Sequence, residues 1–186
     1  MDARVLDHPF EKLTRHQLAW ATALVGAAWA LLTAVLVHAI STHEIAQIQR
    51  LLEASSPVVA SSVLSEWPAS VFSSFAFLLG FDLLYDVVHN NATALFAIWG
   101  ARRLGHPVAA LAGRGIAWVL WLDTALNLFE NLAFLHVIRA LEPWPLLPWA
   151  AGIFSFRSAT LGAGIVVGVV LHGLAFWQRS ARRQSR

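Results

Sequence analysis

The stretch Asp82-Leu-Leu-Tyr-Asp-Val-Val-His-Asn-Asn-Ala92 recurs in outline 41 positions later, as Asp123-Thr-Ala-Leu-Asn-Leu-Phe-Glu-Asn-Leu-Ala133. Both stretches follow the pattern Asp-x3-[Asp/Asn]-x2-[His/Glu]-Asn-x-Ala, and both lie inside segments that are otherwise apolar enough to cross a membrane. A charged side chain at the centre of a bilayer costs roughly 2.5–3.5 kcal/mol even on the scales with the smallest penalties. The repeat therefore indicates a membrane protein and marks where its function lies.

The composition is that of an integral membrane protein. Of the 186 residues, 58% are hydrophobic and 13% are charged, which is too apolar for an ordinary soluble domain. The nine tryptophans are typical of aromatic belts at two membrane interfaces. The absence of cysteine excludes disulfides and thiol chemistry. The basic residues lie where membrane topology would place them, so the net charge of +2 predicts no nucleic-acid partner.

Four runs have the length of membrane spans, about 20 predominantly apolar residues each. They cover about residues 18–40, 68–100, 116–141 and 148–177. A helix satisfies its own backbone hydrogen bonds in lipid, where water is absent. The sequence therefore predicts an all-α polytopic membrane protein, a four-transmembrane-helix antiparallel bundle, in which residues 1–186 form a single membrane domain.

Basic residues predict the orientation of the chain. They gather before the first span, between the second and third spans, and after the fourth, whereas the other two connections hold only Arg50 and Arg139. By the positive-inside rule, both termini are cytoplasmic. We expect a multi-pass protein of a cytoplasmic (inner) membrane.

The long connection formed by residues 41–67 contains a second pattern. Within residues 43–53, Ile45, Ile48 and Leu52 share one helical face, which predicts a short helix lying on the outer membrane surface. The alternative is a plain extension of the first span. The serine-rich stretch that follows, up to Ser65, is predicted to be a linker.

Each half of the repeat places its polar residues on one helical face. At 100° per residue, the first, fifth and eighth positions of the motif lie within about 60° of one another, and the ninth lies beside them. In lipid, such stripes should face the interior of a bundle or a wet cavity. The two stripes are Asp82, Asp86, His89 and Asn90 in the second span, and Asp123, Asn127, Glu130 and Asn131 in the third.

Residue counts from the connection near Arg103 predict that Asp82 and Asp123 meet at one level, within about 10 Å of each other. The rest of each motif diverges from that level toward opposite sides of the membrane, as in the inverted repeats of transporters. Two carboxylates at one level in a low dielectric should share a proton.

Arg157 in the fourth span is the expected counter-charge. Its depth matches that of Glu130 within about one helical turn, and Gly164 and Gly168 on the same face favour close helix contact. We expect Arg157 to pair with Glu130 and to reach toward the level of Asp82. One guanidinium cannot neutralise four carboxylates, so protons, a charged histidine or a cation must supply the rest.

The stripes form the predicted site. Convergent acids in a pocket with apolar walls suit a lipid-like or isoprenoid ligand, and a protonated carboxyl beside a carboxylate or histidine suits acid/base catalysis. The predicted catalytic residues are Asp82, Asp123, Glu130, Asp86 and His89, and the predicted ligand-binding residues are Asn90, Asn127, Asn131, Arg157 and Tyr85.

Two other functional classes stay open. A polar ladder across the membrane also suits a proton- or cation-coupled small transporter or channel subunit. Hydrogen bonds that only specify packing suit an accessory or assembly subunit of a membrane complex. The predicted partners are membrane lipids, an apolar small molecule, and a second copy or another membrane protein.

We expect no metal ligands in the stripes. Asp86-x2-His89 and Asn127-x2-Glu130 have the i, i+3 spacing of ligand pairs in di-metal helical bundles. However, only one histidine lies on a stripe. If a metal were bound, the oxygen-rich set of side chains would favour Mg, Ca or Mn over Zn or Cu. The sequence identifies no cofactor.

The motifs also resemble those of small bacterial four-span membrane proteins of unassigned function. The resemblance rests on Phe81-Asp82-Leu-Leu-Tyr85 in the second span, Asn127-x2-Glu130-Asn131 in the third and Arg157 in the fourth. The chain departs from that pattern by having Asn127 in place of Asp. The resemblance implies a bacterial membrane protein and no particular activity.

Overall fold

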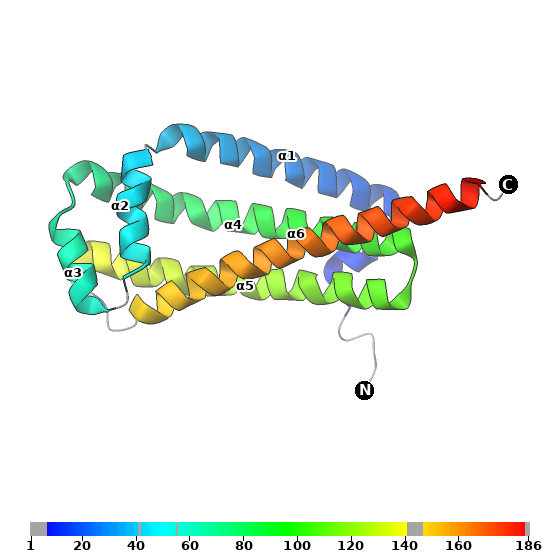
Figure 1. Cartoon of the computed structure of the whole chain (residues 1–186). Helices are drawn as coiled ribbons and strands as arrows, with labels where there is room; N and C mark the ends of the chain where they lie inside the picture. The colour runs from blue at the N-terminus through cyan, green and yellow to red at the C-terminus, as the bar shows by residue number, and fades with distance from the viewer. Residues whose placement is uncertain (1–6, 41, 55, 141–146, 185–186) are drawn as a thin grey trace. The chain divides into compact units, whose positions relative to one another are not determined.

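The computed structural model describes residues 7–40, 42–54, 56–140 and 147–184, whose only regular secondary structure is helical. Four of the helices contain a segment long and apolar enough to cross a membrane: α1, α4, α5 and α6. The predicted all-α class with four membrane-spanning helices is therefore confirmed. The α-helices, labelled in Figure 1, are α1 (Arg15–Ala39), α2 (Thr42–Leu52), α3 (Pro57–Ser65), α4 (Ala69–Leu104), α5 (Pro107–Ala140) and α6 (Leu147–Gln184). A short 3-10 helix, η2 (Pro9–Lys12), precedes them.

The long helices expose many large apolar side chains, whose exposure to water would be unfavourable. On α1, the side chains of Leu24, Leu31 and Val37 are 65–67% exposed. A soluble monomer rarely leaves large contiguous apolar patches uncovered. Lipid tails would cover this surface, in agreement with the membrane-spanning length of the helix.

The turn between α4 and α5 is much shorter than the sequence indicates. The predicted spans leave residues 101–115 as a connection, whereas Gly105 and His106 alone separate the two helices. Gly105 has a φ of 69°, a left-handed conformation that glycine adopts at helix ends without steric cost. The arginines at the end of α4 interrupt the hydropathy but are good helix formers, so the helix continues through them. The predicted end of the third span, at about residue 141, lies outside the described residues.

The connection from residue 41 to residue 67 contains two helices. The predicted helix within residues 43–53 is present as α2, separate from α1, so the alternative of a plain extension of the first span is wrong. The predicted linker is also wrong, because α3 occupies Pro57–Ser65. The Ser56 side chain accepts a hydrogen bond from the Val59 N–H at 3.3 Å and caps α3, as serine commonly does. Apolar residues spaced along one face of α3 are buried: Ala60, Val63 and Leu64.

The chain divides into two compact packing units, and every long helix runs from one unit into the other. Unit 1 contains the described residues within 1–29, 88–123 and 159–186, and unit 2 contains those within 30–87 and 124–158. Each unit has its own apolar core and its own polar cluster, described separately below. The organisation of residues 1–186 as a single domain stays a prediction.

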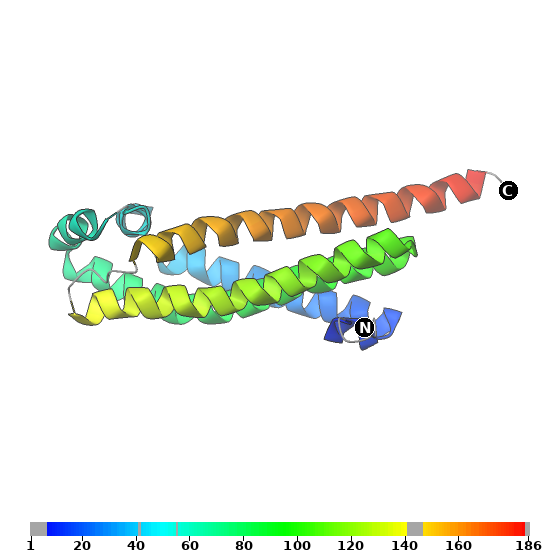
Figure 2. The same cartoon turned by 90° about the horizontal axis from the view of Figure 1, so that it is seen from below.

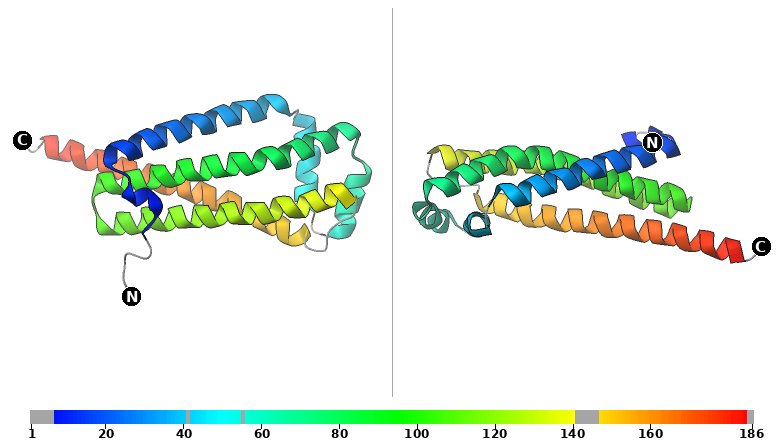
Figure 3. Two further views of the ribbon diagram at one scale, coloured as in Figure 1. Left: turned by 180° about the vertical axis from the view of Figure 1, so that it is seen from behind. Right: turned by 90° about the horizontal axis from the view of Figure 1, so that it is seen from above.

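In unit 2, α2 and α3 pack beside the first turns of α4 and the last turns of α5 (Figures 1 and 3). The Trp67 ring lies 5.4 Å from the Phe75 ring of α4, and the Phe75 ring lies 5.6 Å from the Phe134 ring of α5, both edge to face. Aromatic pairs in this geometry stabilise a core by about 0.5–1.5 kcal/mol beyond their buried area. This core holds α4 and α5 together next to the turns that carry the polar residues.

In unit 1, the second part of α6 lies along the α4–α5 hairpin (Figure 2). A Cβ atom on Gly168 would lie 2.8 Å from Cε1 of Phe96, and one on Gly164 would lie 3.0 Å from Cγ2 of Thr93. A Cβ at Gly168 would require Phe96 to move, and one at Gly164 would fit tightly; such close approaches are typical of packed membrane helices. The predicted close helix contact at Gly164 and Gly168 is therefore confirmed, with α4 as a partner helix.

Candidate functional site

Arg157 of α6 is the centre of a buried polar cluster in unit 2. Its Nη1 donates to Oε2 of Glu130 at 2.5 Å and to Oδ1 of Asn127 at 2.7 Å. Its Nη2 donates to Oδ1 of Asp86 at 2.5 Å. One guanidinium thus bridges two carboxylates that come from two other helices, α4 and α5. Charge-assisted bonds of this kind are about twice as strong as neutral ones.

Asn131 extends this cluster to a third carboxylate. Its Nδ2 donates to Oδ2 of Asp82 at 3.0 Å and to Oδ1 of Asn127 at 2.7 Å. The chain of hydrogen bonds therefore continues from Asp82 through two amides to Arg157. The six residues form what we call the Arg157 cluster: Asp82, Asp86, Asn127, Glu130, Asn131 and Arg157.

Helical spacing explains why these side chains converge. Asp82 and Asp86 are one turn apart on α4, and the three polar residues of α5 lie within one turn, so each helix presents them on one face. Asp86 and Asn127 are completely buried, and Glu130, Asn131 and Arg157 nearly so, whereas Asp82 is half-buried. Buried polar groups persist only when they are hydrogen-bonded, and buried charges only when paired.

The Arg157 cluster contains more acidic groups than basic ones. Three carboxyl groups share one guanidinium, and Arg157 contacts two of them, Asp86 and Glu130. The third, Asp82, accepts a hydrogen bond from a neutral amide. In a low dielectric, such an excess of negative charge must be offset by protons or by a cation. Carboxylate oxygens suit hard cations such as Mg²⁺ and Ca²⁺, although Arg157 already occupies the cationic position between two of them.

Unit 1 has a separate polar cluster around Asp123 of α5. This carboxylate is buried and accepts hydrogen bonds from Nδ2 of Asn90 at 2.9 Å and from Oγ1 of Thr160 at 3.1 Å. A ring nitrogen of His89 lies within 4.8 Å of a carboxylate oxygen of Asp123. We call His89, Asn90, Asp123 and Thr160 the Asp123 cluster. It combines a carboxylate with a histidine, the side chain whose ordinary pKa is nearest to neutrality.

The two clusters contain the same hydrogen bond, made reciprocally. Asp82 opens the first motif and accepts from Asn131, which is the ninth residue of the second motif. Asp123 opens the second motif and accepts from Asn90, which is the ninth residue of the first. The Asp and Asn at these two motif positions therefore serve to join α4 to α5 once in each unit.

Several predicted contacts can be compared with this geometry. The predicted pairing of Arg157 with Glu130 is confirmed. The sequence did not predict Asp86 as a second partner, nor Thr160 as a donor to Asp123, although Thr160 lies one turn beyond Arg157. The predicted approach of Asp82 to Asp123, and their sharing of a proton, joins residues of different packing units and stays a prediction.

Tyr85, a predicted ligand-binding residue, contacts α1. Its hydroxyl lies 3.2 Å from Oγ1 of Thr33, with either atom able to donate. Its ring stacks on Phe81 with 6.1 Å between centroids, and Phe81 stacks on Phe77 in turn. These contacts make Tyr85 part of an aromatic row along α4.

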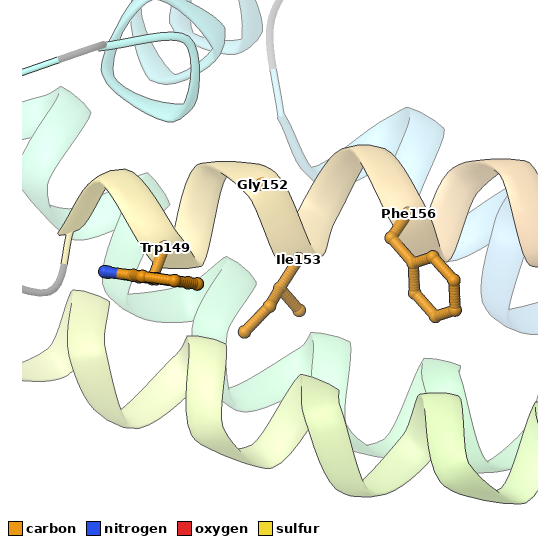
Figure 4. Close-up of a pocket in the computed structure, with 4 residues that line it drawn as sticks. All are labelled: Trp149, Gly152, Ile153 and Phe156. Carbon is orange, nitrogen blue, oxygen red and sulfur yellow. The ribbon is translucent and has the colours of Figure 1, made fainter.

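An apolar pocket of about 350 Å³ lies along the first turns of α6 in unit 2. Trp149, Gly152, Ile153 and Phe156 line it (Figure 4). Phe156 immediately precedes Arg157 in the sequence, but the described lining of the pocket contains no residue of the Arg157 cluster. Its volume lies at the lower end of the range for small-molecule sites, about 300–1,000 Å³.

Comparison with known proteins finds no matching family model, no matching curated protein and no matching solved structure. Function is therefore inferred from the geometry and charge of the two clusters.

Proposed function

We propose that the Arg157 cluster binds and releases a proton within the membrane, and that the protein is a proton- or cation-coupled small transporter or channel subunit. The observation that supports this most directly is the presence of three carboxyl groups around one guanidinium, within helices apolar enough to cross a membrane. The charge of such a cluster depends on how many protons it holds. A change in that number would alter the attraction between α4, α5 and α6.

A purely structural role would not require carboxyl groups. Asparagine or glutamine could make interhelical hydrogen bonds without an ionisation cost, and such bonds contribute only about 0.6 kcal/mol on average. Asp82 is the strongest candidate for proton exchange, because it is half-buried and held by a neutral amide instead of the guanidinium. Asp123, with His89 close to it, is the second candidate.

The test is proton flux into proteoliposomes that contain a trapped pH-sensitive dye. We expect Asp82→Asn and Asp123→Asn each to abolish the pH-dependent flux that the unaltered protein supports. The matched control is Glu66→Gln, which also removes one carboxylate but at an exposed site where Arg50 pairs with it at 3.5 Å. This control should retain the flux of the unaltered protein.

Two further measurements separate loss of function from loss of folding. Size-exclusion profiles and thermal unfolding show whether each variant is folded, and Asp82→Glu keeps the carboxyl group while it changes the length of the side chain. Flux in Asp82→Glu but not in Asp82→Asn supports proton exchange at this position. Full flux in both Asp→Asn variants would eliminate the proposal and favour the accessory or assembly subunit.

The apolar pocket on α6 favours a second candidate function, a binding or acid/base catalytic site for a lipid-like or isoprenoid ligand. The pocket has a lining of apolar side chains and a volume of about 350 Å³, which suit an apolar chain. We expect Ile153→Trp to fill the pocket and to reduce the lipids that co-purify, as measured by mass spectrometry. Val166→Trp, on an exposed face of the same helix, is the control. Equal lipid retention in both variants would contradict this candidate.

A further inference from the structure

A strongly basic pocket of about 290 Å³ lies in unit 1, and its lining residues belong to neither of the two polar clusters. It is at the place where α1 begins and where α4 and α6 approach their ends. Its lining consists of Arg15, Trp99, Arg102, Arg103 and Arg179. Three helices that are far apart in the sequence thus contribute four guanidinium groups to one small space.

Within the described part of the chain, the four arginines of this pocket have no carboxylate as an ion-pair partner. Among the residues that the structure describes, no carboxylate lies within 4 Å of these four guanidinium groups. Like charges that converge in this way repel one another, most strongly where water is partly excluded. A bound anion would remove that repulsion, and an anion with more than one oxygen could contact several arginines at once.

Two of the arginines are held in place before any ligand binds. Arg102 donates to the backbone carbonyls of Glu11 and Leu13. The Arg103 guanidinium carbon lies 5.3 Å from the centroid of the Trp99 ring, and Nη1 of Arg103 lies 3.3 Å from Nδ1 of His172. Side chains that are already ordered lose less entropy on binding, which raises affinity.

We propose that this basic pocket binds a phosphate group, either on the head group of an anionic phospholipid or free in solution. The planar fork of arginine matches phosphate oxygens in a bidentate manner. Basic pockets between membrane-spanning helices are a recurrent way of binding anionic head groups. Trp99 adds an amphipathic ring of the kind that is enriched at the membrane interface.

The experiment uses the full-length protein in nanodiscs. Phosphatidylcholine nanodiscs are compared with and without phosphatidylglycerol, and inorganic phosphate is titrated into the phosphatidylcholine nanodiscs in a separate arm. Native mass spectrometry counts the retained lipids, and thermal unfolding reports stabilisation. We expect phosphatidylglycerol, inorganic phosphate or both to bind and to raise the unfolding temperature.

The decisive comparison is between two double variants that each remove two positive charges. Arg15→Gln with Arg179→Gln alters the pocket lining at two exposed arginines, whereas Lys12→Gln with Arg183→Gln removes exposed charges nearby in the sequence that do not line the pocket. The pocket variant should bind the phosphate ligand at least about tenfold more weakly, because each basic residue near an anionic surface contributes on the order of a few-fold. The control variant should change binding much less.

Each result has a definite meaning. A response to phosphatidylglycerol alone assigns the site to a lipid, and a response to inorganic phosphate alone assigns it to a soluble anion. Equal weakening in the two double variants would overturn the proposal, because it would show diffuse attraction to the basic ends of the helices. The absence of any response to either phosphate source would overturn it as well.

Discussion

Replacement of Arg157 by glutamine should destabilise the protein more than any other single loss of charge. Glutamine is shorter and neutral, so the substitution removes both ion pairs of the guanidinium, with Asp86 and with Glu130. It leaves one carboxyl group completely buried and another 4% exposed, with no cation between them. Such uncompensated buried charge is the main source of the expected cost.

The magnitude follows from the number and burial of the broken contacts. Removal of one partner from a buried ion pair typically costs about 3–5 kcal/mol. The ion pair between Arg50 and Glu66 has a separation of 3.5 Å and side chains that are 54% and 56% exposed, so Arg50→Gln should cost no more than about 1 kcal/mol. The difference between the two variants should therefore be about 2 kcal/mol or more.

The assay is reversible unfolding in mixed micelles, followed by tryptophan fluorescence at neutral and acidic pH. The loss in unfolding free energy caused by Arg157→Gln should become smaller as the pH falls, because protonation neutralises the carboxyl groups that are left without a cation. Adding Asp86→Asn and Glu130→Gln should restore most of the lost stability at neutral pH. The reasoning is refuted if Arg157→Gln is as stable as Arg50→Gln, or if the triple variant is less stable than the single one.

Three further predictions concern unit 1. Gly168→Ala should destabilise the protein by about 1–3 kcal/mol through overpacking. The control Gly162→Ala has nothing within 4 Å of the added Cβ and should raise helix stability slightly. Thermal unfolding compares the two variants. Burial lowers the pKa of His8 from its usual value near 6.5, so the neutral ring is favoured in the folded N-terminal segment. The stabilising contribution of the buried neutral ring should be complete above about pH 6.5 and decline below it. Amide hydrogen exchange of residues 8–12, corrected for intrinsic rates, should therefore show faster opening of this segment at acidic pH. No change in the opening rate between about pH 5 and 7 would contradict this. Thr160→Val removes a hydrogen bond to a carboxylate and should cost about 1.5–3 kcal/mol in unfolding experiments, while the exposed Ser158→Ala should stay within about 0.5 kcal/mol.

Helical periodicity was sufficient to predict which polar residues would be buried. The stripes of both motifs placed their charged and amide side chains on one face of each helix, and most of these side chains are buried. This succeeds because an apolar solvent penalises any polar group that faces it, so the buried face is the polar one. The lengths of the helices were less well predicted. The arginines near the end of α4 interrupt the run of apolar residues, but the helix continues through them.

The partners of the buried residues were harder to predict. Residue counts from the connection near Arg103 compare only the depths of two side chains, and the turn between α4 and α5 lies close to that residue, at Gly105 and His106. A guanidinium on a long side chain also reaches across more than one turn, so matched depth could not decide between Glu130 and Asp86. The basic pocket was not predictable at all, because Arg15 and Arg179 come from opposite ends of the chain and only packing brings them together.

The reciprocal hydrogen bonds explain why the motif recurs. Asp82 with Asn131, and Asp123 with Asn90, use the same two motif positions to join α4 to α5. This pairing alone requires an Asp and an Asn in each helix, and it does not require the other positions to match.

The side chains at those other positions differ in chemistry. At the fifth and eighth positions, Asp86, Asn127 and Glu130 all contact the permanent positive charge of Arg157, whereas His89 lies near Asp123. Two carboxyl groups of the Arg157 cluster, those of Asp86 and Glu130, are thus paired with a guanidinium, whereas the carboxyl group of the Asp123 cluster lies near an imidazole ring. The two motifs therefore form polar clusters of different composition, although each cluster contains the same Asp–Asn hydrogen bond between α4 and α5.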